Sequence, residues 1–146
     1  MSGLVKSVSP HADAIANELA SELHGKLDQP KIDAVVAALK APAASQSANA
    51  TTICLIFYTH VAGATPGHSF SGNAGGICVP PGGSGAGTLY SDNFNSLFSQ
   101  TVSFSFVAAV AYLGIQFYDS HHNLLGHYEG GGVYTPGTGG GTMSWS

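Results

Sequence analysis

An internal repeat is the feature of this sequence that most restricts its fold. The segment "GGICVPPGG" at 75–83 recurs as "GGGVYTPGTGG" at 130–140, and the nearby "GAGTLYS" recurs as the terminal "GGGTMSWS". Upstream of these, "IFYTHVAGATPGHSFSG" at 56–72 resembles "IQFYDSHHNLLGHYEGG" at 115–131. Two copies of a roughly four-strand unit predict a pseudo-twofold barrel or sandwich, with the glycines at corners where the strands turn sharply.

The first forty residues have the pattern of two helices. Ser9 is a good N-cap with Pro10 at the first helical position, which predicts a helix over 10–27. Asp28 is a capping residue at the start of a second helix over 30–40. The apolar stripes are Ile15, Leu19, Leu23 and Leu27 in the first helix and Ile32, Val35, Val36 and Leu39 in the second. We therefore expect an N-terminal helical hairpin with one apolar side.

The rest of the chain alternates β-branched and aromatic runs with turn residues about every ten positions, which is typical of an all-β sandwich or barrel. "APAASQSANA" at 41–50 is either a linker or a weak first strand, and "SDNFNSLFSQ" predicts one short helix capped by Ser91 or Asp92. The expected strands are 52–61, 67–72, 75–80, 86–91, 101–108, 110–119, 123–133 and 139–145. We expect a helical hairpin and linker over 1–44 and a β-barrel domain over 45–146.

Strand alternation predicts which side chains face the inside of the barrel. Two matching apolar sets should point inward: Ile53, Leu55 and Phe57 in the first copy and Leu113, Ile115 and Phe117 in the second. The opposite face of the first copy is also apolar, at Cys54 and Ile56. We expect the helical hairpin or a partner to cover these two residues.

Charge is distributed unevenly along the chain. The net charge is −4; all four lysines lie within the first forty residues, and 41–146 contains three acids and no lysine or arginine. A surface without cations cannot neutralise phosphates, which argues against nucleic-acid binding and excludes a polybasic lipid-binding patch in that region. The longest apolar stretch, "VAAVAYLGI", has nine residues. Because a membrane-spanning helix needs about twenty, no transmembrane segment is expected.

The sequence does not decide the cellular compartment of the protein or the redox state of its two cysteines. Cys54 and Cys78 could form one disulfide or remain as buried thiols. The N-terminal sequence has no apolar segment ahead of a small-residue cleavage site, so no secretory signal is expected. The alternatives are a protein that stays inside the cell and a mature or trimmed exported one.

No pattern in the sequence predicts an enzyme or a cofactor site. "GHSFSG" lacks the G-x-S-x-G spacing of a nucleophile elbow, and "GGSGAG" lacks the lysine of a phosphate-binding loop. We therefore expect neither catalytic residues nor a bound cofactor.

Histidines are the remaining candidates for chemistry. The candidate residues are His60, His68, Asp119, His121, His122 and His127. A metal site needs about three converging ligands, and adjacent histidines in an extended segment point in opposite directions, which argues against a metal. The favoured alternative is pH sensing, because these side chains become cationic below about pH 6.5 on a barrel that has no other cations.

Several long motifs in the barrel region resemble one known family. "GTLYSDNFNSLFSQTVSFSF", "YLGIQFYDSHHNLLGHYEGGGV", "SFSGNAGGICVP" and "GGGTMSWS" occur in the order found in the virulence-associated proteins (Vap family) of pathogenic rhodococci. The resemblance covers about 100 residues, from near Thr51 to Ser146. It implies a compact eight-stranded antiparallel β-barrel with one short helix, built from two Greek-key halves.

The resemblance also implies a function and a location. It implies a secreted, non-enzymatic factor that supports bacterial survival in the macrophage vacuole, acting on host endolysosomal membranes, on vacuolar pH or on a host protein. Any membrane contact would then strengthen when histidines are protonated. Two alternatives are a lipocalin-like barrel that carries a small molecule and a cytoplasmic module that self-associates through its helical hairpin.

Overall fold

The computed structural model describes residues 6–76, 78 and 80–146, and within these residues the chain is mainly β. The helices are α1 (Ala12–Leu23), α2 (Gln29–Lys40) and α3 (Phe94–Gln100). The strands are β1 (Ala44–Cys54), β2 (Tyr58–Thr65), β3 (His68–Gly75), β4 (Gly82–Ser91), β5 (Ser103–Ala108), β6 (Tyr112–Tyr118), β7 (Leu124–Gly131), β8 (Val133–Tyr134) and β9 (Gly137–Trp145). The two-residue β8 pairs only with the start of β4.

Eight of these strands close into an antiparallel barrel. Their order is β1-β2-β3-β9-β5-β6-β7-β4, and β4 pairs with β1 to complete the ring. Each half of the chain has the strand order of a Greek key, β4-β1-β2-β3 in the first half and β9-β5-β6-β7 in the second. Closure removes the sheet edges that would otherwise invite pairing with another chain. The predicted fold class is confirmed.

The glycine-rich repeat corresponds to matching strands of the two halves. "GAGTLYS" lies in β4 and "GGGTMSWS" covers most of β9, and these strands occupy the same place in their respective Greek keys. The repeat also aligns the aromatic pair Phe57–Tyr58 with Phe117–Tyr118, and this match is wrong in the structure, since Phe57 lies in the turn before β2, Tyr58 begins β2, and the second pair ends β6. The aromatic pair repeats in the sequence without occupying equivalent positions in the barrel.

The strand boundaries of the first half differ from the sequence prediction. β1 begins inside the segment 41–50, which confirms a first strand there rather than a linker. The predicted strand 52–61 is wrong, because residues 55–57 form a tight turn between β1 and β2. The predicted strand 75–80 is also wrong at its described positions, since β3 ends at Gly75 and the next strand starts at Gly82. Residues 77 and 79 of that segment lie outside the described residues.

The first apolar set has the opposite orientation to the predicted one. Ala48 and Ala50 point into the barrel, and the alternation of β1 therefore puts Thr52 inside and Ile53 outside. Ile53, Leu55 and Phe57 are all exposed, so their predicted inward orientation is wrong. The second predicted set, Leu113, Ile115 and Phe117, is fully buried, as predicted.

Side chains fill the body of the barrel. Tyr128 and Phe117 are the largest fully buried ones, and the Phe117 ring meets the edge of Phe70 at a centroid distance of 5.1 Å. An eight-stranded barrel is just wide enough to be filled in this way. Large interior cargo therefore has no room in the middle of this barrel.

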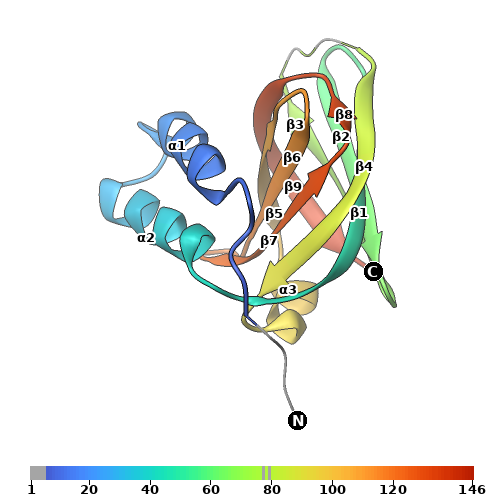
Figure 1. Cartoon of the computed structure of the whole chain (residues 1–146). Coiled ribbons are helices and arrows are strands. Elements are labelled where there is room, and N and C mark those ends of the chain that lie inside the picture. Colours follow the sequence, from blue (N-terminus) through green and yellow to red (C-terminus); the bar gives the residue numbers. More distant parts are fainter. Residues whose placement is uncertain (1–5, 77, 79) are drawn as a thin grey trace.

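The helical hairpin lies against the outer face of the second half of the barrel (Figure 1). Ile15 and Leu19 of α1 and Leu39 of α2 share one apolar cluster with Val107 and Tyr118 of the barrel. Gly114 makes this approach possible, since an added Cβ there would come within 2.7 Å of the Ile15 side chain.

The prediction that the hairpin covers Cys54 and Ile56 is therefore wrong. Ile56 is 52% exposed at the β1–β2 turn, and Cys54 is buried inside the barrel rather than beneath a helix. A helix packs on a broad strand face with room for its side chains, which β5 and β6 offer and a turn does not. Whether a partner covers Ile56 stays a prediction.

Candidate functional site

One end of the barrel has no aspartate, glutamate, lysine, arginine or histidine in its connections. Among the described residues, this end, called here the disulfide end, consists of the connections 55–57, 109–111 and 132–136, the last of which includes the short β8, and of residues 76, 78, 80 and 81 between β3 and β4. α3 lies at the opposite end of the barrel, as Figure 1 shows. Two acids of the barrel lie elsewhere: Asp92, which is exposed, is near α3, and Asp119, which is partly buried, is in the β6–β7 turn. The two ends therefore differ sharply in polarity.

Large apolar side chains are exposed at the disulfide end. The β1–β2 turn and its flanks form a patch called here the apolar tip, composed of Ile53, Leu55, Ile56, Phe57 and Tyr58. The Phe57 side chain is the most exposed of these, at 75%. Val110 and Val133, in two other connections of the same end, are also exposed. Contiguous exposed apolar residues of this size are typical of an interaction surface.

The backbone of the apolar tip satisfies its own hydrogen bonds. The Leu55 N–H donates to the Tyr58 carbonyl at 2.8 Å, and the Phe57 N–H donates to the Leu55 carbonyl at 2.8 Å. The carbonyls of Ile56 and Phe57 accept from Cys78 and Gly76. The Ile56 N–H points to the Cys54 Sγ at 3.4 Å. The tip therefore presents side chains outward and keeps its polar backbone groups paired within the protein.

Ile56 adopts a strained conformation at the centre of this turn. Its φ is 72°, and the hydrogen bond from residue 57 to residue 55 closes a γ-turn around it. A β-branched residue in the left-handed region is a genuine outlier, and such strain tends to gather at functional sites. The surrounding structure holds Ile56 in this conformation and so keeps its side chain exposed.

A disulfide between Cys54 and Cys78 fixes the tip to the β3–β4 connection. Of the two alternatives that the sequence left open, the structure has the disulfide. Cys54 is the last residue of β1, so the bond lies directly beneath Leu55 and Ile56.

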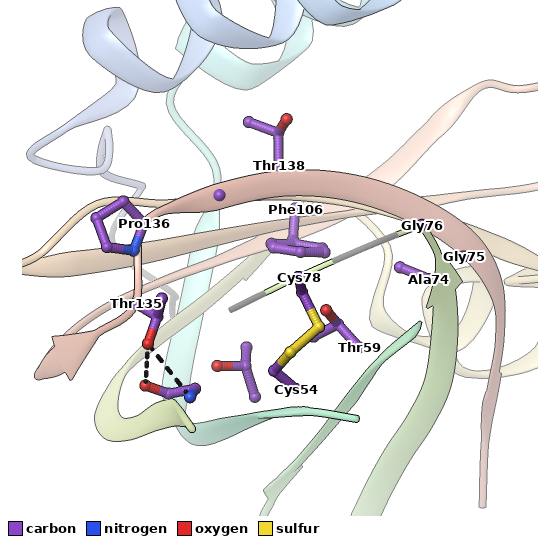
Figure 2. Close-up of a pocket in the computed structure, with 13 residues that line it drawn as sticks. Cys54, Thr59, Ala74, Gly75, Gly76, Cys78, Phe106, Thr135, Pro136 and Thr138 are labelled. Carbon is purple, nitrogen blue, oxygen red and sulfur yellow. Dashed lines mark hydrogen bonds between the residues drawn. A yellow bond between two sulfur atoms is a disulfide. The ribbon is translucent and has the colours of Figure 1, made fainter. Parts of the chain in front are cut away.

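A pocket of about 220 Å³ opens at the mouth of the barrel beside the disulfide (Figure 2). Its lining contains no charged side chain; Phe106 and Ala74 supply apolar walls, and Thr52 and Thr59 supply hydroxyls. Both threonines are more than nine-tenths buried. Among the residues that the structure describes, neither hydroxyl has a hydrogen-bond partner within the protein.

The structure does not gather the six candidate residues into one site. His60 bonds Asn73 on the neighbouring strand, and His68 stacks on Phe98 of α3. Asp119 accepts hydrogen bonds from the backbone N–H groups of His121 and Asn123 within its own turn. Across the described part of the chain, no three histidine, cysteine or acidic side chains are placed to hold a metal ion.

His122 and His127 lie in different surroundings from each other. His122 lies in the exposed β6–β7 turn with a φ of 62°. His127 is buried, and its ring stacks on Tyr90 at a centroid distance of 4.9 Å. Burial disfavours the charged imidazole and lowers the pKa of His127 to about 4. His127 is thus a neutral side chain of the protein interior at neutral pH.

A buried carboxylate joins the barrel to the hairpin, and sequence analysis missed it. Glu129 of β7 accepts hydrogen bonds from the backbone N–H of His11, at 2.9 and 3.0 Å, and lies 2.9 Å from His11 Nδ1. His11 is the residue that precedes α1, so the barrel supplies the cap that was predicted for Ser9. The predicted Ser9 cap and the helix start at Pro10 are both wrong. A negative charge is favourable at a helix N-terminus.

Removing this carboxylate should loosen the hairpin. Glu129→Ala leaves the His11 donors without their partner, and we expect it to lower the free energy of unfolding by about 1–3 kcal/mol. Urea unfolding at pH 7.5 would measure the loss, with faster hydrogen exchange in α1 as the local readout. The control is Glu18→Ala, an exposed acid on α1, which should change stability by less than about 0.5 kcal/mol. Equal midpoints for the two variants would contradict the prediction.

A cluster of three buried polar side chains from β5 and β6 lies beneath the helical hairpin. Ser105 donates to Gln116 Oε1 at 2.7 Å and is 2.8 Å from the Tyr118 hydroxyl. All three side chains are buried, and burial raises the pKa of Tyr118 to about 12. No spacing in the sequence marks these residues, because they meet across neighbouring strands.

This chain is similar to virulence-associated proteins of Rhodococcus equi. The family model described as Rhodococcus equi virulence-associated protein matches residues 6–146. A solved structure of virulence-associated protein VapB from the intracellular pathogen Rhodococcus equi is 35% identical, with a TM-score of 0.66, and the match covers 70% of this chain and 95% of that one. VapD from the same pathogen is 32% identical, with a TM-score of 0.64, and the match covers 70% and 96% of the two chains. None of the curated proteins searched matches.

Among the described residues, no helix combines the length and the apolar character that crossing a membrane would require.

Proposed function

The chain belongs to the Rhodococcus equi virulence-associated protein family, and from that membership we propose that it is a secreted, non-enzymatic factor acting on host endolysosomal membranes. The observation that supports membrane action is the apolar tip, at a barrel end whose connections contain no charged residue or histidine. We propose that this tip is the part that enters the lipid.

Lipid is a better match for the tip than a protein partner. A segment that enters hydrocarbon must satisfy its backbone polar groups internally, and the hydrogen bonds of the β1–β2 turn do so. Tyr58 at the base of the tip is the kind of side chain that lies at a membrane interface. Burying Leu55, Ile56 and Phe57 would stabilise the bound state by roughly 5 kcal/mol, at about 1.5–3 kcal/mol for each fully buried side chain.

Secretion is supported by the disulfide. Structural disulfides form and persist in oxidising compartments and are rare in the cytosol. The bond between Cys54 and Cys78 therefore favours the exported alternative over the cytoplasmic one.

The placement of the histidines changes the expected pH dependence of binding. None of the candidate histidines lies in the connections of the disulfide end, so insertion of the tip should depend little on pH or on lipid charge. Binding that strengthens at pH 5 would instead assign the contact to surfaces that bear histidines.

Both alternative functions lose support. A lipocalin-like carrier needs an empty barrel, and here Phe117 and Tyr128 fill the centre. Self-association through the hairpin would require its apolar residues, which pack on the barrel instead.

Phe57→Ser should weaken binding to neutral phosphatidylcholine vesicles about tenfold, because it removes the most exposed aromatic side chain of the tip. Co-sedimentation of the full chain over a range of lipid concentrations would measure the change at pH 7.5 and at pH 5. The matched control is Val102→Ser, an exposed apolar residue that follows α3. Absence of binding by the parent protein, or equal losses in both variants, would overturn the proposal.

A further inference from the structure

We propose that the pocket at the barrel mouth binds the uncharged glycerol-ester head of an acylglycerol lipid, whose acyl chains leave along the apolar tip. This inference rests on the proposed function, because it names the lipid that the tip would meet in a membrane. It is argued from the size, the chemistry and the position of the pocket.

The size of the pocket suits a headgroup rather than a whole ligand. Pockets that enclose drug-sized molecules measure about 300–1,000 Å³. A cavity of about 220 Å³ is smaller than these. A three-carbon head with its ester groups is of that order, while complete acyl chains would have to lie outside.

The chemistry of the lining selects an uncharged head with oxygen acceptors. The hydroxyls of Thr52 and Thr59 are the polar groups without a described protein partner, and a hydroxyl can donate to an ester carbonyl and accept from a glycerol hydroxyl. A phosphate in the same place would be buried without a cation, because no lysine or arginine occurs after residue 40. The pocket should therefore discriminate against phosphate-bearing lipids.

The position of the pocket provides an exit for the chains. The disulfide is part of the pocket wall, and the residue after Cys54 begins the exposed turn of the tip. Figure 2 shows Phe106 and Thr59 next to the disulfide, with Thr135 and Pro136 across the opening from them. A head held between these walls would have its ester-linked chains directed to the surface that we propose enters the bilayer.

The walls are fixed before any ligand arrives. Thr135 Oγ1 donates to the Gly82 carbonyl at 3.1 Å and accepts from the Gly82 N–H at 3.3 Å, which joins the 132–136 connection to the start of β4. The disulfide joins the β1–β2 turn to the β3–β4 connection. Preorganisation of this kind lowers the entropy cost of binding.

The test uses dioctanoylglycerol in solution, below the concentration at which it aggregates, so that no bilayer is needed. Titration calorimetry with the full chain should show saturable binding, and dioctanoylphosphatidylglycerol, with the same chains and a charged head, should bind at least tenfold more weakly. Equal affinity for the two lipids, or no binding of dioctanoylglycerol, would overturn the inference.

Two kinds of variant locate the binding. Gly137 lines the pocket, and an added Cβ there would meet no atom within 4 Å, so Gly137→Leu should fill the space and weaken binding at least tenfold. Thr52→Val with Thr59→Val removes the hydroxyls at nearly constant volume and should weaken binding to a similar extent. Thr51→Val, on the outer side of β1, is the matched control and should bind as the parent protein does. Unchanged affinity in both pocket variants, with unfolding midpoints like that of the parent, would overturn the assignment.

Vesicle binding separates this inference from the proposed function. Gly137→Leu should still co-sediment with phosphatidylcholine vesicles, because the tip is intact. Loss of dioctanoylglycerol binding with retained vesicle binding would support both conclusions. Vesicle binding without any dioctanoylglycerol binding in the parent would overturn only the pocket. Failure of the parent to bind vesicles would overturn the proposed function instead.

Discussion

Acidification from pH 6.5 to pH 4 should lower the free energy of unfolding by about 2.5 kcal/mol through His127 alone. The native pKa of about 4 lies below the ordinary value of 6.5, because the ring is buried against Tyr90. Between these two pH values the unfolded chain binds a proton that the native protein does not. Stability from this residue is therefore complete above pH 6.5, declines as the pH falls, and is about 1.4 kcal/mol lower at pH 5.5.

The variant His127→Phe isolates this effect. Phenylalanine retains the stacking on Tyr90 and cannot titrate. Any change with pH in the difference between the unfolding free energies of the parent and the variant should therefore come from His127. Urea unfolding at pH 7.5, 6.5, 5.5 and 4.5 would measure that difference, which should change by roughly 2.5 kcal/mol over the series. His121→Gln, at an exposed position, is the control and should follow the parent. Parallel curves for the parent and His127→Phe would contradict the prediction.

The same titration is a candidate pH-sensing device. Ala38 of α2 and Ala43 line the hollow in which His127 and Tyr90 lie, so the buried ring is close to the hairpin. Two residues further along β7, Glu129 holds the start of α1. We expect acid to loosen this side of the barrel first, in the pH range over which histidine sensors act in endosomes. As the pH is lowered, the rate of hydrogen exchange should increase in α1 and α2 at a higher pH than in the barrel strands.

Reduction of the disulfide should lower the free energy of unfolding by about 3.5 kcal/mol. The bond joins residues 24 positions apart, and its main effect is to restrict the unfolded chain. Urea unfolding with and without reductant would measure the loss, with mass spectrometry to confirm reduction.

The double variant Cys54→Ala with Cys78→Ala is the matched control. Its free energy of unfolding should equal that of the reduced parent and should not change when reductant is added. We also expect proteolysis at residues 55–58 to become faster in both, because the disulfide and the hydrogen bond from Cys78 to Ile56 hold the tip in place. Identical midpoints for the oxidised and the fully reduced parent would contradict this account.

The sequence by itself determined the architecture. Helical spacing of apolar residues marked α1 and α2 to within a few positions, and the glycine-rich repeat marked a barrel with two similar halves. These features are local or periodic, so they can be recognised in a single sequence without knowledge of the tertiary structure. The inward set of Leu113, Ile115 and Phe117 was predicted correctly for the same reason, since β6 is one uninterrupted strand.

Only the tertiary structure decided where the candidate sites lie. The alternation of β1 places Ile53 on the outer face, and the tight turn at 55–57 leaves Leu55 and Phe57 exposed, so all three residues lie at the surface instead of in the predicted core. The disulfide partner of Cys54 and the contact of Glu129 with His11 join residues far apart in the sequence. Such contacts depend on closure of the barrel, which no local pattern in the sequence encodes.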